Sequence, residues 1–595
     1  MKKILTPRPL LNGFFALLSV FFILSSCKQY TSTKGAANQE NNTESEEINE
    51  ENAAMLNVRA WPSSFKDMNF PEDSLNLKKT GICMSGGGTR AMVAAVGQLK
   101  GLAHLGLLDE VGYISCVSGG SWASVPFTYY TKGATDDDQL LGTIIPPEKL
   151  TLAGMKTFTP GFLAAAAHAD LGATLLRELG KVPSDELWIQ GVRESYMQPF
   201  GVYDPTASKK YFSLDSATIR EICARNPTLK MSDFLLVRKG KTDLHRPYLV
   251  VNSSISGPFN NAPFKNPEPL AVFNYTPLGI GSAVPLNPVF RSDNGQTNTG
   301  QIGGGFIEPY AFGAFAPKVA PSNCLKGDGP SICLPLKMPK EPFSIGDASG
   351  TSSSAFVADL TALPLFPKLQ DLSPKQTYWQ VPRIDSLLPQ GEKYIFGDGG
   401  NLENLGVITL IQRNVNKLVV FINSDKKLNA AYDTIKNPTP TAKDVSSDIL
   451  TLFGVSTNGS KDIKNNHIFP ESDLNDLMAQ FVKAKKAGRS IIANTTHSTM
   501  ENDWWGIPKD RVVDIVWVYN DNATDYLNQL EWQIRDQIIL ANGFPSFEDF
   551  PNYKTIGEDA LRLVQLSPKQ INLLYQFSAW NVYSNPGKFE ILKEK

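Results

Sequence analysis

The stretch KTGICMSGGGTRAMVAAVGQLKGLAHLGLLDEVGYISCVSGG, residues 79–120, decides the fold of this chain. Its first part, Lys79–Met84, is a short apolar segment, and three glycines follow soon after it. Ala91–Leu107 carries small and apolar side chains at helical spacing, and Val111–Val117 is a second apolar run. A strand, a crossover helix and a second strand form a βαβ unit, in which the two strands are parallel. The stretch therefore predicts an α/β domain.

Ser118 lies directly after the second apolar run, among small residues. A serine on a sharp turn from strand to helix exposes its Oγ for attack on a substrate. Far along the chain, Asp398 lies between Gly397 and Gly399, after the apolar run Tyr394–Phe396. A serine hydroxyl is a weak nucleophile near neutral pH and needs an adjacent base. If the fold brings Asp398 within hydrogen-bond reach of Ser118, the two residues form a catalytic dyad.

The turn Ser85–Arg90 has three interpretations. Its glycines follow a strand and precede a helix, a position in which backbone N–H groups can cradle a phosphate. The lysine and the glycine spacing of the common nucleotide-binding loops are missing, however. The same N–H groups suit an oxyanion hole, where each donor is worth about 3–4 kcal/mol in the transition state. A purely structural turn is the third interpretation.

The N-terminus predicts export from the cytoplasm. Three basic residues within the first eight precede an apolar run from about Phe14 to Leu24. This run is shorter than the stretch of about 20 apolar residues that a spanning helix needs. A charged region, an apolar region and small residues in this order are typical of a secretory signal. An uncleaved signal anchor is the alternative.

The tetrad Leu24–Cys27 (Leu-Ser-Ser-Cys) resembles a bacterial lipobox, whose cysteine is lipidated and becomes the first residue of the mature chain. The resemblance implies a lipoprotein signal peptide over residues 1–26 and a lipid anchor at Cys27 in the bacterial cell envelope. Lys28 stands where aspartate marks retention in the inner membrane, so the outer membrane is favoured. Residues 27–56 are polar with almost nothing to bury and predict a flexible tether.

The remaining residues, 57–595, predict one large domain with insertions, because no repeat and no second long linker divides them. The chain is 42% hydrophobic and 19% charged with a net charge of −2, without the basic excess of a nucleic-acid-binding protein. No cysteine or histidine spacing resembles a metal site. We therefore expect no metal, no cofactor and no nucleic-acid partner, and we infer no protein partner. Whether Cys324 and Cys333 form a disulfide stays open at this point.

Further strands and helices are expected beyond the first βαβ unit. The expected strands are Tyr248–Asn252, Lys393–Phe396, Lys417–Asn423 and Asp514–Tyr519, and the expected helices are Glu403–Arg413, Leu474–Ala487, Ala523–Asn542 and Pro568–Phe577. Two segments rich in proline and glycine, 254–350 and 425–470, predict long loops. Loops of that length in a compact domain are usually functional or disordered, and lids or walls of a substrate channel would be the functional version.

Five blocks, in this order along the chain, resemble the catalytic domain of the cytosolic phospholipase A2 and lysophospholipase family, which is related to the patatins. The blocks are SGGGTRAM at 85–92, VSGGSW at 117–122, FNYTP at 273–277 followed by Gly281, SAF at 354–356 and DGG at 398–400. Only the first two are specific when taken individually. The resemblance implies a three-layer α/β/α fold with a central, largely parallel sheet and long loop insertions.

The resemblance also implies roles for individual residues. It makes Ser118 the nucleophile and Asp398 the base of a Ser-Asp dyad. Gly87 and Gly88 would donate to the oxyanion, and Arg90 would bind the phosphate of a phospholipid head group. The implied reaction is hydrolysis of an acyl ester of a phospholipid or lysophospholipid through an acyl-enzyme.

Two positions depart from the family pattern. Cys116 stands where a glycine is usual before the nucleophile, and Gly406 stands where patatin-like chains often have proline. The first departure leaves open a catalytically silent, lipid-binding lipoprotein on the same fold. An acyltransferase is open as well, because the acyl-enzyme is common to hydrolysis and acyl transfer.

Overall fold

The structure is a computed structural model that describes residues 53–240, 246–262, 270–291, 295, 297–324, 330–360, 367–457, 466–539, 547–555 and 565–593. Residues 53–595 belong to one compact unit. The predicted signal peptide, Cys27 and most of the predicted tether lie outside the described residues. The first strand, β1 (Met55–Pro62), begins slightly before residue 57, where the large domain was expected to start.

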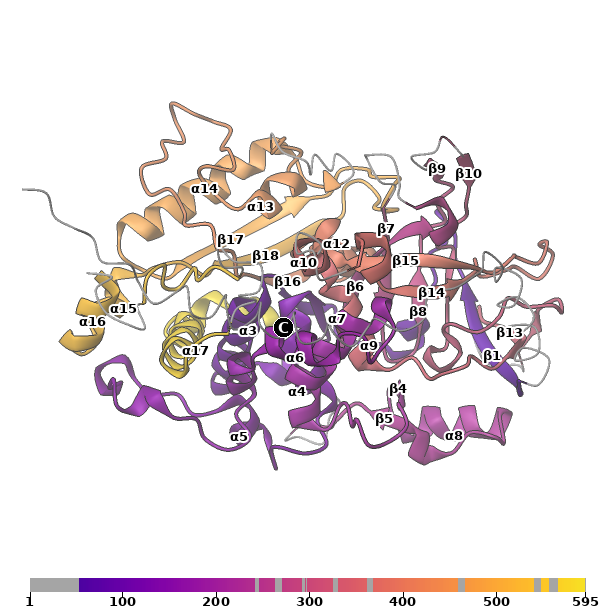
Figure 1. Ribbon diagram of the computed structural model, residues 1–595. Helices are drawn as coiled ribbons and strands as arrows, with labels where there is room; N and C mark the ends of the chain where they lie inside the picture. The colour runs from indigo at the N-terminus through magenta and orange to yellow at the C-terminus, as the bar shows by residue number, and fades with distance from the viewer. Residues whose placement is uncertain are drawn as a thin grey trace, which may run out of the picture. The chain divides into compact units, whose positions relative to one another are not determined.

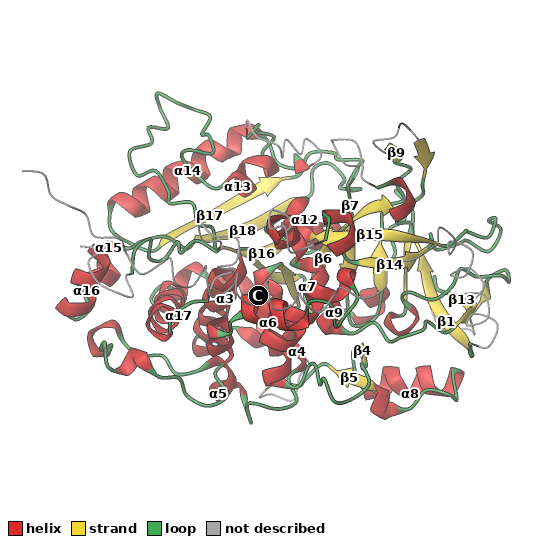
Figure 2. Cartoon of the chain, viewed as in Figure 1, coloured by secondary structure: helices red, strands yellow, loops and turns green. Residues whose placement is uncertain are grey.

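A 14-stranded sheet forms the centre of the molecule (Figures 1 and 2). Its middle is parallel, and neighbouring strands there are β6 (Tyr248–Pro258), β3 (Tyr113–Val117), β2 (Thr80–Met84), β16 (Lys417–Ile422) and β18 (Val512–Tyr519). Every residue of β2, β3 and β6 is buried. Strands that are covered on both faces have no polar side to present, which explains their nearly continuous apolar runs.

Antiparallel strands extend the sheet on both sides of the parallel middle. Beyond β6 follow β7 (Ala271–Tyr275), β8 (Ile280–Ser282), β11 (Gly305–Ile307), β1, β13 (Ile332–Lys337) and β12 (Ser322–Asn323), and β17 (Ile491–Ser498) lies beyond β18. The hairpin of β14 (Lys375–Tyr378) and β15 (Glu392–Asp398) pairs antiparallel with the later part of β6. Two small sheets pair β4 (Tyr211–Ser213) with β5 (Phe234–Leu236) and β9 (Val289–Arg291) with β10 (Thr297–Thr299).

Helices cover both faces of the parallel strands. In Figure 1, α13 and α14 lie above β16 and β18, whereas α3, α4 and α17 lie below them. The α-helices are α3 (Gly88–His104), α4 (Gly119–Tyr129), α5 (Asp137–Leu141), α6 (Leu171–Glu178), α7 (Leu187–Val192), α8 (Ser216–Arg225), α9 (Ile345–Ser352), α10 (Val357–Leu360), α11 (Leu369–Leu372), α12 (Val407–Gln412), α13 (Ser447–Leu452), α14 (Glu471–Lys486), α15 (Thr524–Leu527), α16 (Trp532–Ile539) and α17 (Pro568–Tyr583). The expected α/β fold with a parallel central sheet between helices is confirmed.

Helix α3 is held against the sheet by α17. A Cβ on Gly97 would lie 2.4 Å from the carbonyl oxygen of Tyr575, and one on Gly101 would lie 2.6 Å from Cβ of Val582. Only glycine at these two positions permits such a close approach of the two helices. This packing fixes α3, which begins at Gly88, the last of the three glycines singled out in the sequence.

Several parts of the chain differ from the sequence-based expectation, among them the expected loop 425–470, which contains α13, and the helix expected over Glu403–Arg413, which is reduced to α12. The segment 254–350, expected to be long loops, contains strands β7 to β13, most of which are too short to show an alternating pattern. The single helix expected over Ala523–Asn542 is divided into α15 and α16, and residues 540–542 lie outside the described residues. The edge strand β17 was not expected from the sequence, because the second half of this strand is polar.

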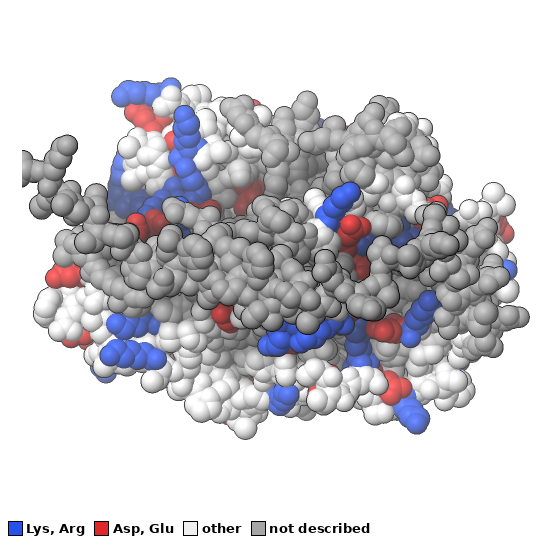
Figure 3. All heavy atoms as spheres, in the orientation of Figure 1, with Lys and Arg blue, Asp and Glu red and all other residues white. Residues whose placement is uncertain are grey.

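Cys324 and Cys333 form a disulfide that links the end of β12 to β13. Within the described ranges, no helix combines the length and the apolar character that crossing a bilayer requires. Nor do the described His, Cys, Asp and Glu side chains gather in a group of three that could hold a metal ion. On the face shown in Figure 3, basic and acidic side chains lie beside one another in several places.

Candidate active site

Ser118 occupies a strained turn between β3 and α4. Its backbone has φ 48° and ψ −124°, so it lies in the region that favours glycine, and the side chain is buried. Such a conformation costs about 1–3 kcal/mol and persists only where neighbours hold it. Oγ of Ser352 accepts the N–H of Ser118 at 3.0 Å and donates to the carbonyl oxygen of Asn252 at 2.5 Å. Ser352 thus fixes the turn and occupies the backbone donor of Ser118.

Asp398 is the last residue of β15, and its carboxylate is oriented by backbone donors. Oδ1 accepts the N–H of Gly400 at 2.6 Å, and Oδ2 accepts the N–H of Ala355 at 3.2 Å. Oγ of Ser254 donates to the carbonyl oxygen of Asp398 at 2.9 Å. The side chain is buried. The direction of the carboxylate is therefore set by its own turn and by the segment that contains Ala355, whereas Ser254 holds the backbone.

The sheet brings the serine turn and the aspartate turn to one rim. β3 and β15 pair with successive parts of the same edge of β6, with Val117 opposite Asn252 and Asp398 opposite Ser253, and β7 pairs with the other edge. A Cβ on Gly399 would lie 3.2 Å from Cγ1 of Val117, so the two turns touch. The segment at the end of α9 contacts both, since it contains the partners of the Ser118 N–H and of Asp398 Oδ2.

The glycine turn supplies free backbone donors beside Ser118. Gly87 (φ 133°) is the N-cap of α3 and Gly88 (φ 57°) is its first residue, and no side chain caps this end of the helix. The first N–H groups of a helix have no partner within the helix and carry partial positive charge. A Cβ on Gly86 would lie 3.1 Å from Cβ of Ser118. The arrangement suits stabilisation of an oxyanion formed at Ser118.

Gly119 lets the two turns approach each other. A Cβ at this position would lie 2.1 Å from the carbonyl oxygen of Gly88, which is backbone and cannot turn away. We expect Gly119→Ala to destabilise the fold by about 1–3 kcal/mol, the usual cost of overpacking. We also expect it to lower activity about 100-fold, because the donors move away from Ser118. Gly587→Ala, where a Cβ meets nothing within 4 Å, is the control; equal melting temperatures for the two variants would contradict this prediction.

Arg90 is buried beneath the glycine turn. Nε donates to the carbonyl oxygen of Asn423 at 2.9 Å, and Nη1 donates to that of Tyr553 at 2.5 Å. Nη2 lies 2.5 Å from the position that a Cβ on Gly87 would take. Burial lowers the pKa of the guanidinium to about 10, so it stays charged at neutral pH. Two of its three nitrogens are engaged by backbone, and binding of a head-group phosphate stays a prediction.

An aromatic chamber adjoins the glycine turn. Trp122 stacks on Tyr196 with ring centroids 4.3 Å apart, and Trp188 stacks on Phe356 at 5.4 Å. Both indole N–H groups point to Oγ of Ser353, at 3.1 and 3.4 Å. These four aromatic rings border a small hollow of about 10 Å³ together with Gly88, Thr89, Leu171 and Thr555. The hollow is apolar and smaller than the roughly 300–1,000 Å³ of most small-molecule sites.

A segment from late in the chain covers the glycine turn. A Cβ on Gly88 would lie 2.9 Å from Cγ2 of Thr555 and 3.3 Å from Cζ of Phe356. Two residues earlier, Tyr553 accepts the Arg90 hydrogen bond. Asn552 donates to the carbonyl oxygens of Ser424 and Asn520 at 3.0 and 3.2 Å. The segment is therefore fastened to the ends of β16 and β18 and forms one wall of the site.

Glu403 is a buried carboxyl group near the aspartate turn. It accepts the N–H of Leu405 at 2.7 Å and the N–H of Ile408 at 3.3 Å, at the start of α12. Burial raises its pKa to about 7, and the charge of Asp448 adds to the rise. Perturbed carboxyl groups cluster at functional sites, but this one faces the backbone of α12. We assign it a structural role.

The raised pKa of Glu403 makes stability depend on pH. The folded protein keeps a proton that the unfolded chain releases above about pH 4.5, so stability falls as pH rises from there to about 7. Glutamine does not titrate, so Glu403→Gln should not show this loss of folding stability, which is on the order of 3 kcal/mol in the wild type. The melting temperature of Glu403→Gln relative to wild type should therefore rise between pH 5 and pH 8. A difference in melting temperature between Glu403→Gln and wild type that stays constant from pH 5 to pH 8 would contradict the assignment.

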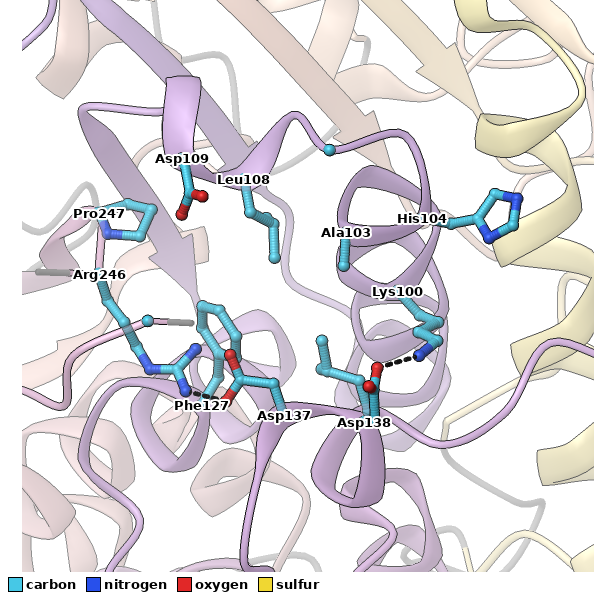
Figure 4. Close-up of a pocket in the computed structure, with 13 residues that line it drawn as sticks. Lys100, Ala103, His104, Leu108, Asp109, Phe127, Asp137, Asp138, Arg246 and Pro247 are labelled. Carbon is cyan, nitrogen blue, oxygen red and sulfur yellow. Dashed lines mark hydrogen bonds and ion pairs between the residues drawn. The ribbon is translucent and has the colours of Figure 1, made fainter. Parts of the chain in front are cut away.

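A second hollow of about 200 Å³ lies at the other end of α3 (Figure 4). The Lys100–Asp138 ion pair, at 2.9 Å, lies on one side of it, and the Arg246–Asp137 ion pair lies on the other. Each of these pairs satisfies its own charges, and none of the residues singled out in the sequence lines the hollow. Ser118 and the glycine turn lie at the opposite, N-terminal end of α3.

The structure brings together all the described residues for which the sequence predicted a role. Ser118, Asp398, Gly87, Gly88 and Arg90 lie at one rim of the sheet, whereas Cys27 lies outside the described residues. Their roles stay predictions. Sequence reasoning missed three residues at this rim, which are Ser352, Asn404 and Thr555. Only the first of them adjoins a recognised block, and none is part of a pattern by itself.

Comparisons with known proteins point to the phospholipases A2. No protein-family model matches the chain. Mouse cytosolic phospholipase A2 zeta is 66% identical over 38 residues, 6% of this chain and 4% of that protein. The human zeta protein is 52% identical over 50 residues (8% and 6%), and the human beta protein is 47% identical over 57 residues (10% and 7%). The likeness is local. The matched segments span less than a tenth of these relatives.

Solved structures give a broader but weaker match. Human GIVD cytosolic phospholipase A2 aligns with a TM-score of 0.41 and 14% identity, over 86% of this chain and 59% of that one. The same protein in complex with methyl gamma-linolenyl fluorophosphonate aligns with a TM-score of 0.37 and 13% identity, over 88% and 59%. The match therefore spans less than two thirds of that protein's chain.

Proposed function

We propose that this protein is a serine hydrolase that cleaves an acyl ester of a phospholipid or lysophospholipid. The observation that carries the proposal is the meeting of three turns at one rim: the strained Ser118 turn, the Asp398 turn and the uncapped start of α3. The local sequence similarity to cytosolic phospholipases A2 supports the substrate class. No histidine is needed in this scheme.

The proposed reaction begins with attack of Ser118 Oγ on the ester carbonyl carbon. Asp398 takes the hydroxyl proton, and the carbonyl oxygen becomes an oxyanion. The N–H groups of Gly87 and Gly88 donate to that oxyanion, since the N–H of Ser118 itself is engaged by Ser352. Collapse of the tetrahedral intermediate breaks the ester bond, and the leaving alcohol takes the proton from Asp398. An acyl-enzyme remains on Ser118.

Water then completes the cycle. Asp398 takes a proton from the water molecule as its oxygen attacks the acyl carbon, and collapse returns the proton to Ser118 Oγ. The aromatic chamber beside Gly88 offers an apolar surface for the acyl chain. The buried charge of Arg90 adds to the positive potential around the oxyanion. Attachment to a membrane through Cys27 would present this site to lipid, and mass spectrometry of the N-terminal peptide tests that part of the proposal.

The test is covalent labelling with an alkyl fluorophosphonate. The reagent traps an activated serine, so mass spectrometry of the labelled protein should place the adduct on Ser118. A protein that hydrolyses no phospholipid or lysophospholipid ester and takes up no label contradicts the proposal, as does an adduct on another serine. Adding an acceptor alcohol during turnover separates hydrolysis from acyl transfer, because only a transferase forms the new ester.

A further inference from the structure

Asn404 lies between the two turns that the proposed chemistry requires. Its carbonyl oxygen accepts the N–H of Gly86 at 3.0 Å, which ties it to the glycine turn. Its Oδ1 lies 2.1 Å from the position of a Cβ on Gly86 and 2.6 Å from that of a Cβ on Gly400. Gly400 in turn donates to Asp398. One side chain therefore packs against both glycine-containing turns at once.

A carboxylate holds the other side of the Asn404 amide. Nδ2 donates to Oδ2 of Asp448 at 3.0 Å. Asp448 lies in the first turn of α13, and Oγ of Ser446, the N-cap residue, donates to the same Oδ2 at 3.2 Å. Because Nδ2 faces Asp448, the amide cannot rotate, and Oδ1 must face the two turns. An amide is the group that supplies a donor on one side and an acceptor on the other.

We propose that Asn404 is a positioning residue that, anchored by Asp448, sets the distance between the oxyanion donors of the glycine turn and the Asp398 turn. It touches no reacting atom. It acts by keeping the Gly86–Gly88 backbone and the Asp398–Gly400 backbone in fixed register, so that attack by Ser118 and stabilisation of the oxyanion occur in one geometry. This inference rests on the proposed function.

Asn404→Asp is the variant that isolates the contact. It keeps the shape of the side chain but turns a carboxylate oxygen towards Oδ2 of Asp448, and two acceptors then repel each other. We expect kcat to fall about 10- to 100-fold with KM changed less than about twofold, since geometry in the transition state is lost rather than ground-state binding. The rate of fluorophosphonate labelling of Ser118 should fall in parallel.

Exchanging the residue types at positions 404 and 448 should restore part of the lost activity. In the double variant N404D/D448N the donor and the acceptor are swapped, so a hydrogen bond can form again across the same gap. We expect its kcat to exceed that of Asn404→Asp at least about fivefold. The matched control is Asn429→Asp, which makes the same change against Asp444, a pair with Nδ2 and Oδ1 at 2.8 Å away from the three turns. It should keep the kcat of wild type.

Each result decides between the alternatives. An Asn404→Asp protein with wild-type kcat and labelling rate overturns the inference, as does a double variant no better than the single one. Equal losses in Asn404→Asp and Asn429→Asp would show general destabilisation and also overturn it. If Asn404→Asp does not fold, Asn404→Ala, which adds no repulsion, should show the same fall in kcat. A wild-type protein without ester hydrolysis or label would contradict the proposed function itself, before any variant is compared.

Discussion

Ser118→Ala is expected to lower the kcat for ester hydrolysis by about 10⁴- to 10⁶-fold and to abolish fluorophosphonate labelling. The reason is that the proposed mechanism has one nucleophile, and loss of the nucleophile removes the covalent route entirely. The fold should be little affected, because the bonds that Ser352 makes to this turn use the backbone N–H of residue 118 rather than its hydroxyl. Initial rates with a chromogenic ester and with a lysophospholipid measure the effect.

The control for this variant is a buried serine on α4, the helix that follows Ser118. Oγ of Ser124 donates to the carbonyl oxygen of Gly120 at 2.9 Å, so Ser124→Ala removes a comparable hydroxyl without touching the rim. We expect it to keep most of the activity and to lose about 1 kcal/mol of stability. Substantial hydrolysis by Ser118→Ala, at a rate above that of a heat-inactivated sample, would show that the mechanism is wrong.

Asp398→Asn is expected to lower kcat by about 10²- to 10⁴-fold, which is the usual contribution of a general base. The amide cannot take the proton of Ser118. It also places an N–H group against one of the two backbone donors, of Gly400 and of Ala355, that now bind the carboxylate. Part of the loss should therefore come from a rotated side chain, and labelling of Ser118 should slow together with turnover.

Asp170→Asn is a suitable control for this change. Asp170 caps α6 by accepting the N–H of Ala173 at 2.9 Å, and asparagine is an equally good N-cap. This variant should keep its activity. If Asp398→Asn labels and turns over at the wild-type rate, the carboxylate is not the base, and the dyad is excluded even if Ser118 remains the nucleophile.

The parallel middle of the sheet could be predicted because its signals are local. Strands β2 and β3 and the helix between them follow one another in the chain, and a glycine-rich turn and a helical pattern separate their short apolar runs. The antiparallel strands beyond β6 could not be predicted, because strands such as β8 and β11 have only three residues each. Their pairing depends on partners that lie far away in the sequence. Propensity alone does not reveal such contacts.

Some residues of the candidate site could likewise be predicted from the sequence, and others could not. Ser118 and Asp398 are flanked by glycines at strand ends, so their special backbone is visible in the sequence. Ser352 and Asn404 are single polar residues, and their importance comes from what the fold places opposite them. Cys116, which departs from the family pattern, is fully buried, and its thiol contacts the carbonyl oxygen of Val250 in the neighbouring strand. The cysteine side chain, which is larger than the usual glycine, is accommodated inside the sheet.

The wall that Tyr553 and Thr555 build over Arg90 and Gly88 has a consequence for biosynthesis. The Arg90–Tyr553 hydrogen bond joins residues 463 positions apart. A nascent chain that has emerged only as far as Asp398 already contains Ser118, Asp398 and the start of α3, yet lacks this wall. We expect such an incomplete polypeptide to be inert towards lipid, so that hydrolytic competence arises only near the end of translation. The order of synthesis would then protect the membranes of the cell that makes the protein.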